Sequence, residues 1–195
     1  MDPSILIALK LIVSFLIGAV PFAVIAMWGT GIDITKAGSG NPGFNNVWRV
    51  TNFQRSMVSL VGDLSKGAVA VVLLSSGADP DWFRWALGLA AVGGHCWTPF
   101  LRFNGGKGVA TMAGALLYLD PSITAACLVL YPTLRWCGRR MGWSQEGAIS
   151  SMTTMTVIAI LVFTLRGAET GIFAAGGLAI VVIRHIPNIR EILSR

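Results

Sequence analysis

A glycine- and asparagine-rich segment, residues 38–49, has the residue types of an anion-binding loop. Its glycines let the backbone turn sharply and bring N–H groups close to a ligand, and successive N–H groups bind anions. Arg49 adds a planar guanidinium that matches the geometry of a phosphate. A plain turn is the alternative interpretation. The candidate binding residues here are Gly38, Ser39, Gly40, Asn41, Gly43, Asn45, Asn46 and Arg49.

The same segment contains the spacing G-x-G-x-x-G, which also occurs in dinucleotide-binding folds. A dinucleotide site requires a preceding strand within a βαβ unit. Here an apolar run long enough for a helix precedes the glycines, and Pro42 lies among them. We therefore exclude a Rossmann site and retain only the anion-binding interpretation.

A second glycine-rich segment, residues 93–111, contains a Gly-Gly-Lys-Gly turn that opens a helix. Free N–H groups at a helix N-terminus beside a lysine form a good phosphate site. The spacing is not that of a Walker loop, because Leu101 stands at its first glycine and Gly108 replaces its Ser/Thr. For the lysine, an interfacial anchor is the alternative. The candidates are His95, Asn104, Gly105, Gly106, Lys107, Gly108 and Thr111.

A third polar segment, residues 184–190, follows the last apolar run and contains His185 and Asn188. The chain has 2 histidines, and both fall beside these polar segments. A site role and a structural role are equally open for His185. Asp63 and Lys66 stand three residues apart, a spacing that predicts either a local ion pair or a part of the site.

The sequence shows no Ser–His–Asp arrangement, no paired carboxylates and no metal-ligand cluster, so neither a metal nor a cofactor is predicted. A His-x-x-x-x-Asp acyltransferase motif is excluded, because Phe100 and Arg190 stand where the aspartate would follow each histidine. The 3 cysteines lack metal-ligand spacing and are interpreted as small buried hydrophobes. The polar segments thus predict anion binding without a protein nucleophile.

The composition places these segments in an integral membrane protein. Of the 195 residues, 54% are hydrophobic and 12% are charged, whereas a soluble domain carries about 25% charged residues. These values exclude intrinsic disorder, a coiled coil and a disulfide-stapled secreted scaffold. The length favours a single domain, residues 1–195.

Apolar runs of about 20 residues cross a bilayer as helices, and the chain has seven candidate runs. They cover approximately residues 5–28, 57–76, 82–100, 109–119, 122–137, 148–165 and 171–186. The fourth is short, which predicts a half-span or a tilted helix inside the bundle. The first lacks the basic start of a cleaved signal peptide. We therefore predict an all-α membrane protein with seven transmembrane helices.

The basic residues gather in one alternating set of loops. Cytoplasmic loops are enriched in Lys and Arg, so the N-terminus is predicted outside and the C-terminus in the cytoplasm. The opposite set holds only Arg84 and Arg166, and Lys10 lies within the first run. The net charge of +6 then reflects topology and a phosphate pocket, and nucleic acid is not a predicted partner. The basic set comprises Lys36, Arg49, Arg55, Lys66, Arg102, Lys107, Arg135, Arg139, Arg140, Arg184, Arg190 and Arg195.

The polar segments resemble the loops of the bacterial acyl-phosphate-dependent glycerol-3-phosphate acyltransferases, the PlsY family, which start phospholipid synthesis. The family's loops read Gly-Ser-Gly-Asn-x-Gly-Ala-Thr-Asn-Val, Gly-His-x-x-x-x-Phe-x-x-Phe-x-Gly-Gly-Lys-Gly-Val-Ala-Thr and Arg-His-x-x-Asn-Ile. They match residues 38–47, 94–111 and 184–189, and Asp-x-x-Lys-Gly matches residues 63–67. The resemblance covers nearly the whole chain, including its length and seven spans.

Three positions depart from the family pattern. Phe44 and Asn45 replace the usual Ala-Thr, and the family's serine at the start of the sixth helix aligns with Gln145, next to Ser144. These changes touch the expected phosphate pocket, so they bear on substrate preference.

The resemblance implies transfer of a fatty acyl group from an acyl phosphate to the sn-1 hydroxyl of glycerol-3-phosphate, among membrane lipids. Lysophosphatidic acid and inorganic phosphate would be the products, and the site would face the cytoplasm from the bacterial inner membrane. Together with the residue chemistry, it implies catalytic roles for Ser39, Arg49, Lys107, His185 and Asn188. It implies substrate binding by Gly38, Gly40, Asn41, Gly43, Asn45, Asn46, Lys66, His95, Asn104, Gly105, Gly106, Gly108, Thr111 and Ser144.

An acyl phosphate is already a mixed anhydride with a good leaving group, so proximity and charge stabilisation would suffice for transfer. The expected step is direct attack by the glycerol hydroxyl, with a donor phosphate oxygen as base and His185 as the alternative proton acceptor. Two other functions stay open: a divergent paralogue with another donor or acceptor, and a transporter for an organic phosphate.

Overall fold

A computed structural model describes residues 2–194, which form eleven α-helices and one short 3-10 helix and contain no strand. The all-α prediction is confirmed over this range. The helices are α1 (Pro3–Ala19), α2 (Phe22–Ala26), α3 (Phe44–Val50), α4 (Phe53–Leu74), α5 (Asp81–Cys96), η1 (Pro99–Leu101), α6 (Val109–Leu119), α7 (Pro121–Leu128), α8 (Leu130–Arg140), α9 (Glu146–Arg166), α10 (Ala168–Arg184) and α11 (Ile186–Leu193).

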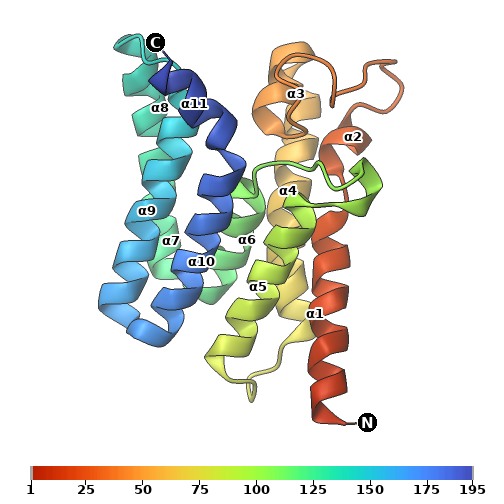
Figure 1. Ribbon diagram of the computed structural model, residues 1–195, viewed down its shortest axis with the longest axis vertical. Helices are drawn as coiled ribbons and strands as arrows, with labels where there is room; N and C mark the ends of the chain where they lie inside the picture. Colours follow the sequence, from red (N-terminus) through yellow and green to blue (C-terminus); the bar gives the residue numbers. More distant parts are fainter. Residues whose placement is uncertain (1, 195) are drawn as a thin grey trace.

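The long helices run side by side along the bundle, with the two chain ends at opposite ends of it (Figure 1). The end that carries the C-terminus also carries α2, α3, the segment of residues 97–108 and α11. We call this the site end. All three polar segments of the sequence therefore lie at one end of the bundle.

Glycines bring the main helix pairs into backbone contact. The packing is most extensive between α1 and α5, between α4 and α6, and between α9 and α10. A Cβ added at Gly18, Gly94 or Gly114 would lie 1.9 Å from a backbone oxygen of the facing helix, and one at Gly67 would lie 2.0 Å away. Small residues at such crossings are typical of helices that pack inside membranes.

Three helical stretches are long and apolar enough by themselves to cross a membrane: Pro3–Ala26, Phe53–Leu74 and Glu146–Arg166. Helices α10 and α11, bent by 59° at their junction, make a fourth candidate if the pair counts as one span. Helix α6 has 11 residues, which at about 1.5 Å per residue is much shorter than a hydrocarbon core of roughly 30 Å. The seven-span count and the orientation stay predictions.

Several boundaries differ from those predicted. The first apolar run breaks at Val20–Pro21, since proline supplies no N–H to continue the helix. The fifth run is divided into α7 and α8. The predicted loop after the first run contains α3 and the start of α4, where the Asn52 side chain caps the helix by accepting from the Arg55 N–H at 3.0 Å.

The tail beyond α10 is helical rather than a simple loop. Its helix α11 begins next to Pro187, a residue that suits the first turn of a helix. The predicted basic residue Arg195 lies outside the described residues. The bend between α10 and α11 places Asn188 at the site end, beside the segment of residues 97–108.

Candidate functional site

Contacts at the site end join the three polar segments, although they are far apart in the sequence. Lys107 donates a hydrogen bond to Asn188, which links the second segment to the third. Arg184 also reaches the second segment through its guanidinium. A Cβ added at Gly106 would lie 3.0 Å from the carbonyl oxygen of Pro42, so the first segment packs there too. The structure thus brings the sequence-predicted segments into one site.

Lys107 is half-buried where these segments meet. Its Nζ donates to the Oδ1 of Asn188, a neutral partner. Burial lowers the pKa of Lys107 to about 8, and the positive charges of Arg184 and Arg49 act in the same direction. An ammonium whose pKa is lowered by burial and by other positive charges would be stabilised by an anion, which relieves that repulsion.

Lys107 stands directly before the N-terminus of α6. Gly108 occupies the N-cap position in the left-handed conformation, with φ of 81°, and no side chain caps the helix. A Cβ there would also lie 2.9 Å from the Cys96 Sγ, so glycine fits on both counts. The N–H groups of the first turn of a helix have no partner within the helix and carry a partial positive charge. Lysine and helix start together have the chemistry of the predicted anion site, which stays a prediction.

Arg184 clamps the loop that carries Lys107. Its Nε donates to the Gly106 carbonyl at 3.0 Å, and its Nη2 donates to the Gly105 carbonyl at 2.7 Å. The same nitrogen lies 3.4 Å from the Asn104 Oδ1. The sequence analysis placed Arg184 in the third segment and gave it no site role. The available signal was its place as the first residue of the Arg-His-x-x-Asn-Ile match, directly before His185.

The N–H groups of Gly105 and Gly106 are used within the protein. They donate to the carbonyl oxygens of Cys96 at 3.0 Å and His95 at 3.2 Å. The predicted nest at these two glycines is therefore occupied by the chain's own backbone, because the loop folds back onto the end of α5. Their remaining role is close packing, since a Cβ at Gly105 would lie 2.0 Å from the His95 oxygen.

His185 is 2% exposed and both of its ring nitrogens have partners. Nδ1 lies 2.8 Å from the Val181 carbonyl oxygen, which can only accept, so Nδ1 carries the proton. Nε2 lies 3.1 Å from the Ser151 Oγ and accepts that hydroxyl proton. The hydroxyl also lies 3.0 Å from the Ala148 carbonyl, a second acceptor toward which it can turn.

Ser151 is a hydrogen-bond partner of the candidate His185 that the sequence analysis did not name. It lies within α9, whereas the family's serine had been aligned with Gln145, just before that helix. The Ser150-Ser151 pair inside an otherwise apolar run was the sequence feature that could have pointed to this residue. Its spatial partner is 34 residues away in the sequence, so local pattern alone does not reveal the pairing.

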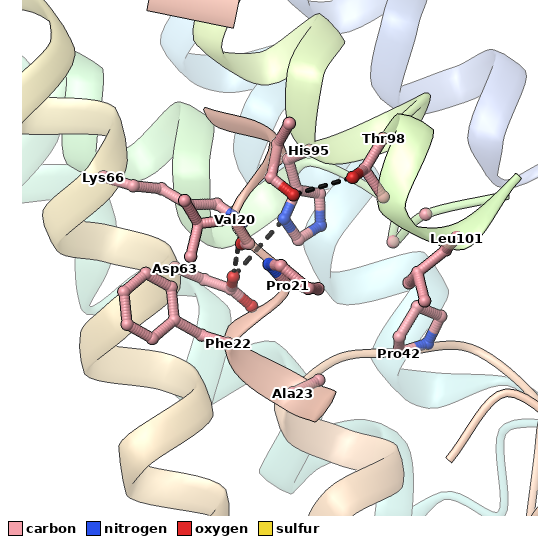
Figure 2. A pocket seen from close by; sticks show the side chains of 13 residues that line it. Val20, Pro21, Phe22, Ala23, Pro42, Asp63, Lys66, His95, Thr98 and Leu101 are labelled. Atoms are coloured by element: carbon pink, nitrogen blue, oxygen red, sulfur yellow. Dashed lines mark hydrogen bonds and ion pairs between the residues drawn. The ribbon is translucent and has the colours of Figure 1, made fainter. Parts of the chain in front are cut away.

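Asp63, Lys66 and His95 form a buried cluster beside the break between α1 and α2 at Val20 and Pro21 (Figure 2). The Lys66 Nζ lies 2.8 Å from the Asp63 Oδ1 and donates to the Val20 carbonyl at 2.8 Å. The His95 Nδ1 lies 3.4 Å from the same Asp63 oxygen. All three side chains are buried. The ion-pair interpretation of Asp63 and Lys66 is therefore confirmed.

A cavity of about 10 Å³, large enough for one water molecule, adjoins this cluster. It is lined by all three members and by Gly106, and a Cβ at Gly106 would lie 2.2 Å from the His95 Nε2. The cavity is too small for a substrate phosphate. His95 thus packs against the loop at Gly106, and Lys66 lines the same cavity.

Asn46 holds the first glycine segment in shape. It is buried, its Oδ1 accepts from the Ser39 N–H at 2.8 Å, and its Nδ2 donates to the Ala37 carbonyl at 2.9 Å. It also donates to the Ile34 carbonyl at 3.2 Å. The side chains of Ser39 and Arg49, in contrast, are exposed at the site end.

Gly38 and Gly40 adopt positive φ, of 61° and 71°, and Gly43 is the N-cap of α3. Asn41 is half-buried beside them. Asn45, by contrast, points toward α8: its Oδ1 accepts from Arg135, and its Nδ2 lies 3.2 Å from the Tyr131 hydroxyl. One of the family departures thus connects α3 to α8.

The remaining candidates lie around the anion site in different settings. Asn104 is exposed on the loop. Thr111 is fully buried in the first turn of α6, and its hydroxyl has no hydrogen-bond partner among the described residues. The Ser144 hydroxyl is likewise buried without such a partner.

Residues 8–195 match the sequence profile of the family described as "Glycerol-3-phosphate acyltransferase". The chain belongs to this family. A glycerol-3-phosphate acyltransferase of Rubrobacter xylanophilus is 35% identical over 188 residues, covering 95% of this chain and 90% of the relative. A "Glycerol-3-phosphate acyltransferase 2" of Bacillus cereus is 38% identical over 192 residues, covering 96% and 91%.

Solved structures agree with the family assignment. The chain resembles the crystal structure of PlsY (YgiH), an integral membrane glycerol 3-phosphate acyltransferase, in its glycerol 3-phosphate form. The TM-score is 0.85 at 26% identity, covering 96% of this chain and 92% of the other. The lysophosphatidic acid form of the same enzyme gives a TM-score of 0.83. The chain is thus an integral membrane protein of an acyltransferase family, as the resemblance implied.

Proposed function

We propose that the chain transfers a fatty acyl group from an acyl phosphate to the sn-1 hydroxyl of glycerol-3-phosphate. The products are lysophosphatidic acid and inorganic phosphate. The observation that carries the proposal is Lys107, half-buried at the uncapped start of α6 with the neutral Asn188 as its acceptor. Burial and the charges of Arg184 and Arg49 lower the pKa of Lys107. A site with several positive charges suits two anionic substrates. The apolar helices of the bundle suit the fatty chain of the donor.

In this proposal the glycerol hydroxyl oxygen attacks the carbonyl carbon of the donor directly. The bond between that carbon and the bridging phosphate oxygen breaks, and the phosphate leaves with the electron pair. Lys107 and the α6 N-terminus stabilise the departing phosphate, and Arg49 and Ser39, both exposed at the site end, hold a second phosphate. Asn188 orients Lys107 through its side-chain oxygen.

A phosphate oxygen of the donor takes the hydroxyl proton. His185 is the alternative acceptor, and its Nε2 becomes free when the Ser151 hydroxyl turns from it to the Ala148 carbonyl. Of the other candidates, Gly38, Gly40, Asn41, Gly43, Asn104, Gly108, Thr111 and Ser144 surround the substrates. We assign positioning roles to Asn46, Lys66, His95, Gly105 and Gly106, whose polar groups already have partners in the protein.

The proposed topology has seven spans, an outside N-terminus and a site that faces the cytoplasm from the bacterial inner membrane. Helix α6 is its short fourth span. The position of all three polar segments at the end of the bundle that carries the C-terminus supports it (Figure 1). Membrane lipids surround the bundle and supply the environment for the acyl chain.

The test is an assay of the purified full chain in lipid nanodiscs, with glycerol-3-phosphate and either palmitoyl phosphate or palmitoyl-CoA. We expect lysophosphatidic acid and inorganic phosphate in equal amounts from palmitoyl phosphate, and no product from palmitoyl-CoA. Product from the CoA ester alone would overturn the donor assignment.

A divergent paralogue is the second candidate, because Asn45 contacts Arg135 and Tyr131 of α8 where the family usually has threonine. Turnover with another alcohol phosphate but not with glycerol-3-phosphate would support it. A phosphate transporter instead predicts uptake of labelled glycerol-3-phosphate into vesicles without lipid product.

A further inference from the structure

Gln145 joins Lys107 and Asn188 in one line of side-chain hydrogen bonds. The Asn188 Nδ2 donates to the Gln145 Oε1 at 2.7 Å, and the Gln145 Nε2 donates to the Glu191 Oε2 at 2.6 Å. Lys107 donates to the Asn188 Oδ1 at the other end. The line therefore runs from the anion site to a carboxylate on α11, with two side-chain amides between them.

The chemistry of the two ends fixes the direction of every bond in this line. An ionised carboxylate only accepts and an ammonium only donates. Glu191 therefore selects the NH₂ side of Gln145, which leaves the Gln145 oxygen for Asn188. That oxygen in turn selects the NH₂ side of Asn188, which leaves the Asn188 oxygen facing Lys107. A flipped Asn188 would instead point two N–H groups at an ammonium.

The backbone of Gln145 adopts an unfavourable conformation. It has φ of 59°, in the left-handed region, directly before α9. This conformation is uncommon for residues other than glycine, asparagine and aspartate. Glycine there would relieve the strain, so a loss of activity in a glycine variant is separable from a loss of stability.

We propose that Gln145 is a positioning residue that holds the Asn188 amide, and through it Lys107, in the orientation required for acyl transfer. The proposal rests on the function proposed above, because it needs Lys107 to act on a substrate phosphate. Gln145 itself contacts no substrate in this account. It acts only by orienting the Asn188 amide so that the amide oxygen faces Lys107.

The first test compares Gln145→Gly with wild type in the palmitoyl phosphate assay, with thermal unfolding measured in parallel. We expect kcat to fall about fivefold, near the net value of one hydrogen bond, while the melting temperature stays the same or rises. Gln145→Asn is the matched variant, since asparagine tolerates this backbone but lacks one methylene of reach. It should lose activity to the same extent.

A double-mutant cycle locates the effect. Asn188→Asp presents two equivalent oxygens, so there is no amide to orient, and Gln145→Gly should cause no further loss in that background. Additive losses would overturn the proposal, as would unchanged activity in Gln145→Gly. A parallel fall in activity and melting temperature would show a structural role and would overturn it as well.

Replacing the acceptor at Glu191 by a donor distinguishes an effect through the line of hydrogen bonds from an effect of charge alone. Glu191→Lys places a donor where an acceptor stood, so it should turn both amides and lower kcat about tenfold, while Glu191→Gln offers an acceptor as well as a donor and should lower kcat less. Extra positive charge alone predicts tighter binding of anionic substrates and no fall in kcat. Lys107→Ala is measured alongside. If Lys107→Ala is fully active, the proposed function fails. If Lys107→Ala is inactive but Gln145→Gly is fully active, only the proposed role of Gln145 fails.

Discussion

Lys66 and Lys107 lie at the same end of the bundle, each within a glycine-containing motif, yet their surroundings are opposite. Lys66 is 4% exposed and meets the Asp63 carboxylate and a backbone carbonyl. Lys107 is half-buried, meets a neutral amide, and has Arg184 and Arg49 nearby. The first charge is balanced inside the protein, and we propose that a ligand balances the second.

The comparison shows that residue type and motif do not separate a structural lysine from a functional one. A buried ion pair is costly to break because one partner is left charged and unpaired. A lysine among cations costs stability in the free protein and gains on binding an anion. The difference lies in partners contributed by distant parts of the chain, and each of the following variants tests it.

The largest effect is expected for Lys66→Met. It leaves the Asp63 carboxylate buried without its cation, which should lower the free energy of unfolding by about 3–5 kcal/mol. Chemical unfolding in one fixed detergent measures this. The double variant Asp63→Asn with Lys66→Met removes both charges and keeps an acceptor for His95, so it should recover most of the loss. Equal stability in Lys66→Met and wild type would refute the structural role.

Lys107→Ala should act on turnover instead of stability. Loss of one charge-stabilising group at the departing phosphate is expected to lower kcat/KM by about 100-fold, or roughly 2.7 kcal/mol. The melting temperature should hold or rise, because a repelling cation is removed. A variant with normal turnover would contradict the assignment of Lys107.

The pH dependence sharpens the contrast further. The pKa of Lys107 is lowered to about 8 by burial, Arg184 and Arg49. The ammonium is the active form, so kcat/KM should be retained below this pKa and fall about tenfold per pH unit above it. Lys107→Arg should remove this limb, because a guanidinium stays charged. The measurement is the profile of kcat/KM from about pH 6 to 10. If the fall at high pH is unchanged in Lys107→Arg, that fall belongs to another group.

A smaller effect is expected for Arg184→Lys. A single ammonium does not reproduce the two bonds to the Gly105 and Gly106 carbonyls. The loop should loosen and kcat should fall about fivefold, near the net value of one hydrogen bond. Steady-state kinetics in nanodiscs measures this, and a change in KM alone would indicate a substrate contact in place of a clamp.

Much of the fold could be predicted because its signals are local. Apolar runs located the long helices, and the Gly-Gly-Lys-Gly turn correctly placed the start of α6. The breaks at Val20–Pro21 and inside the fifth run, and the short helices α3 and α11, lay below what periodicity resolves. A seven-residue helix such as α3 contains too few turns for a clear apolar stripe.

The site was predicted by residue type more completely than by role. The three polar segments were found because glycine, asparagine and basic residues cluster in them. The roles depend on contacts between residues far apart in sequence, such as Lys107 with Asn188 at a separation of 81 and Arg184 with Gly106 at 78. Ser151 and Gln145 acquire their partners in the same way, so no spacing rule identifies them.

The most direct test measures phosphate release from palmitoyl phosphate and glycerol-3-phosphate for two proteins side by side. One is Lys107→Ala, and the other is the double variant Asp63→Asn with Lys66→Met, both checked for wild-type melting. The account predicts a loss of about 100-fold for the first and activity within about tenfold of wild type for the second. The opposite ranking, with Lys107→Ala active and the folded double variant inactive, would contradict it.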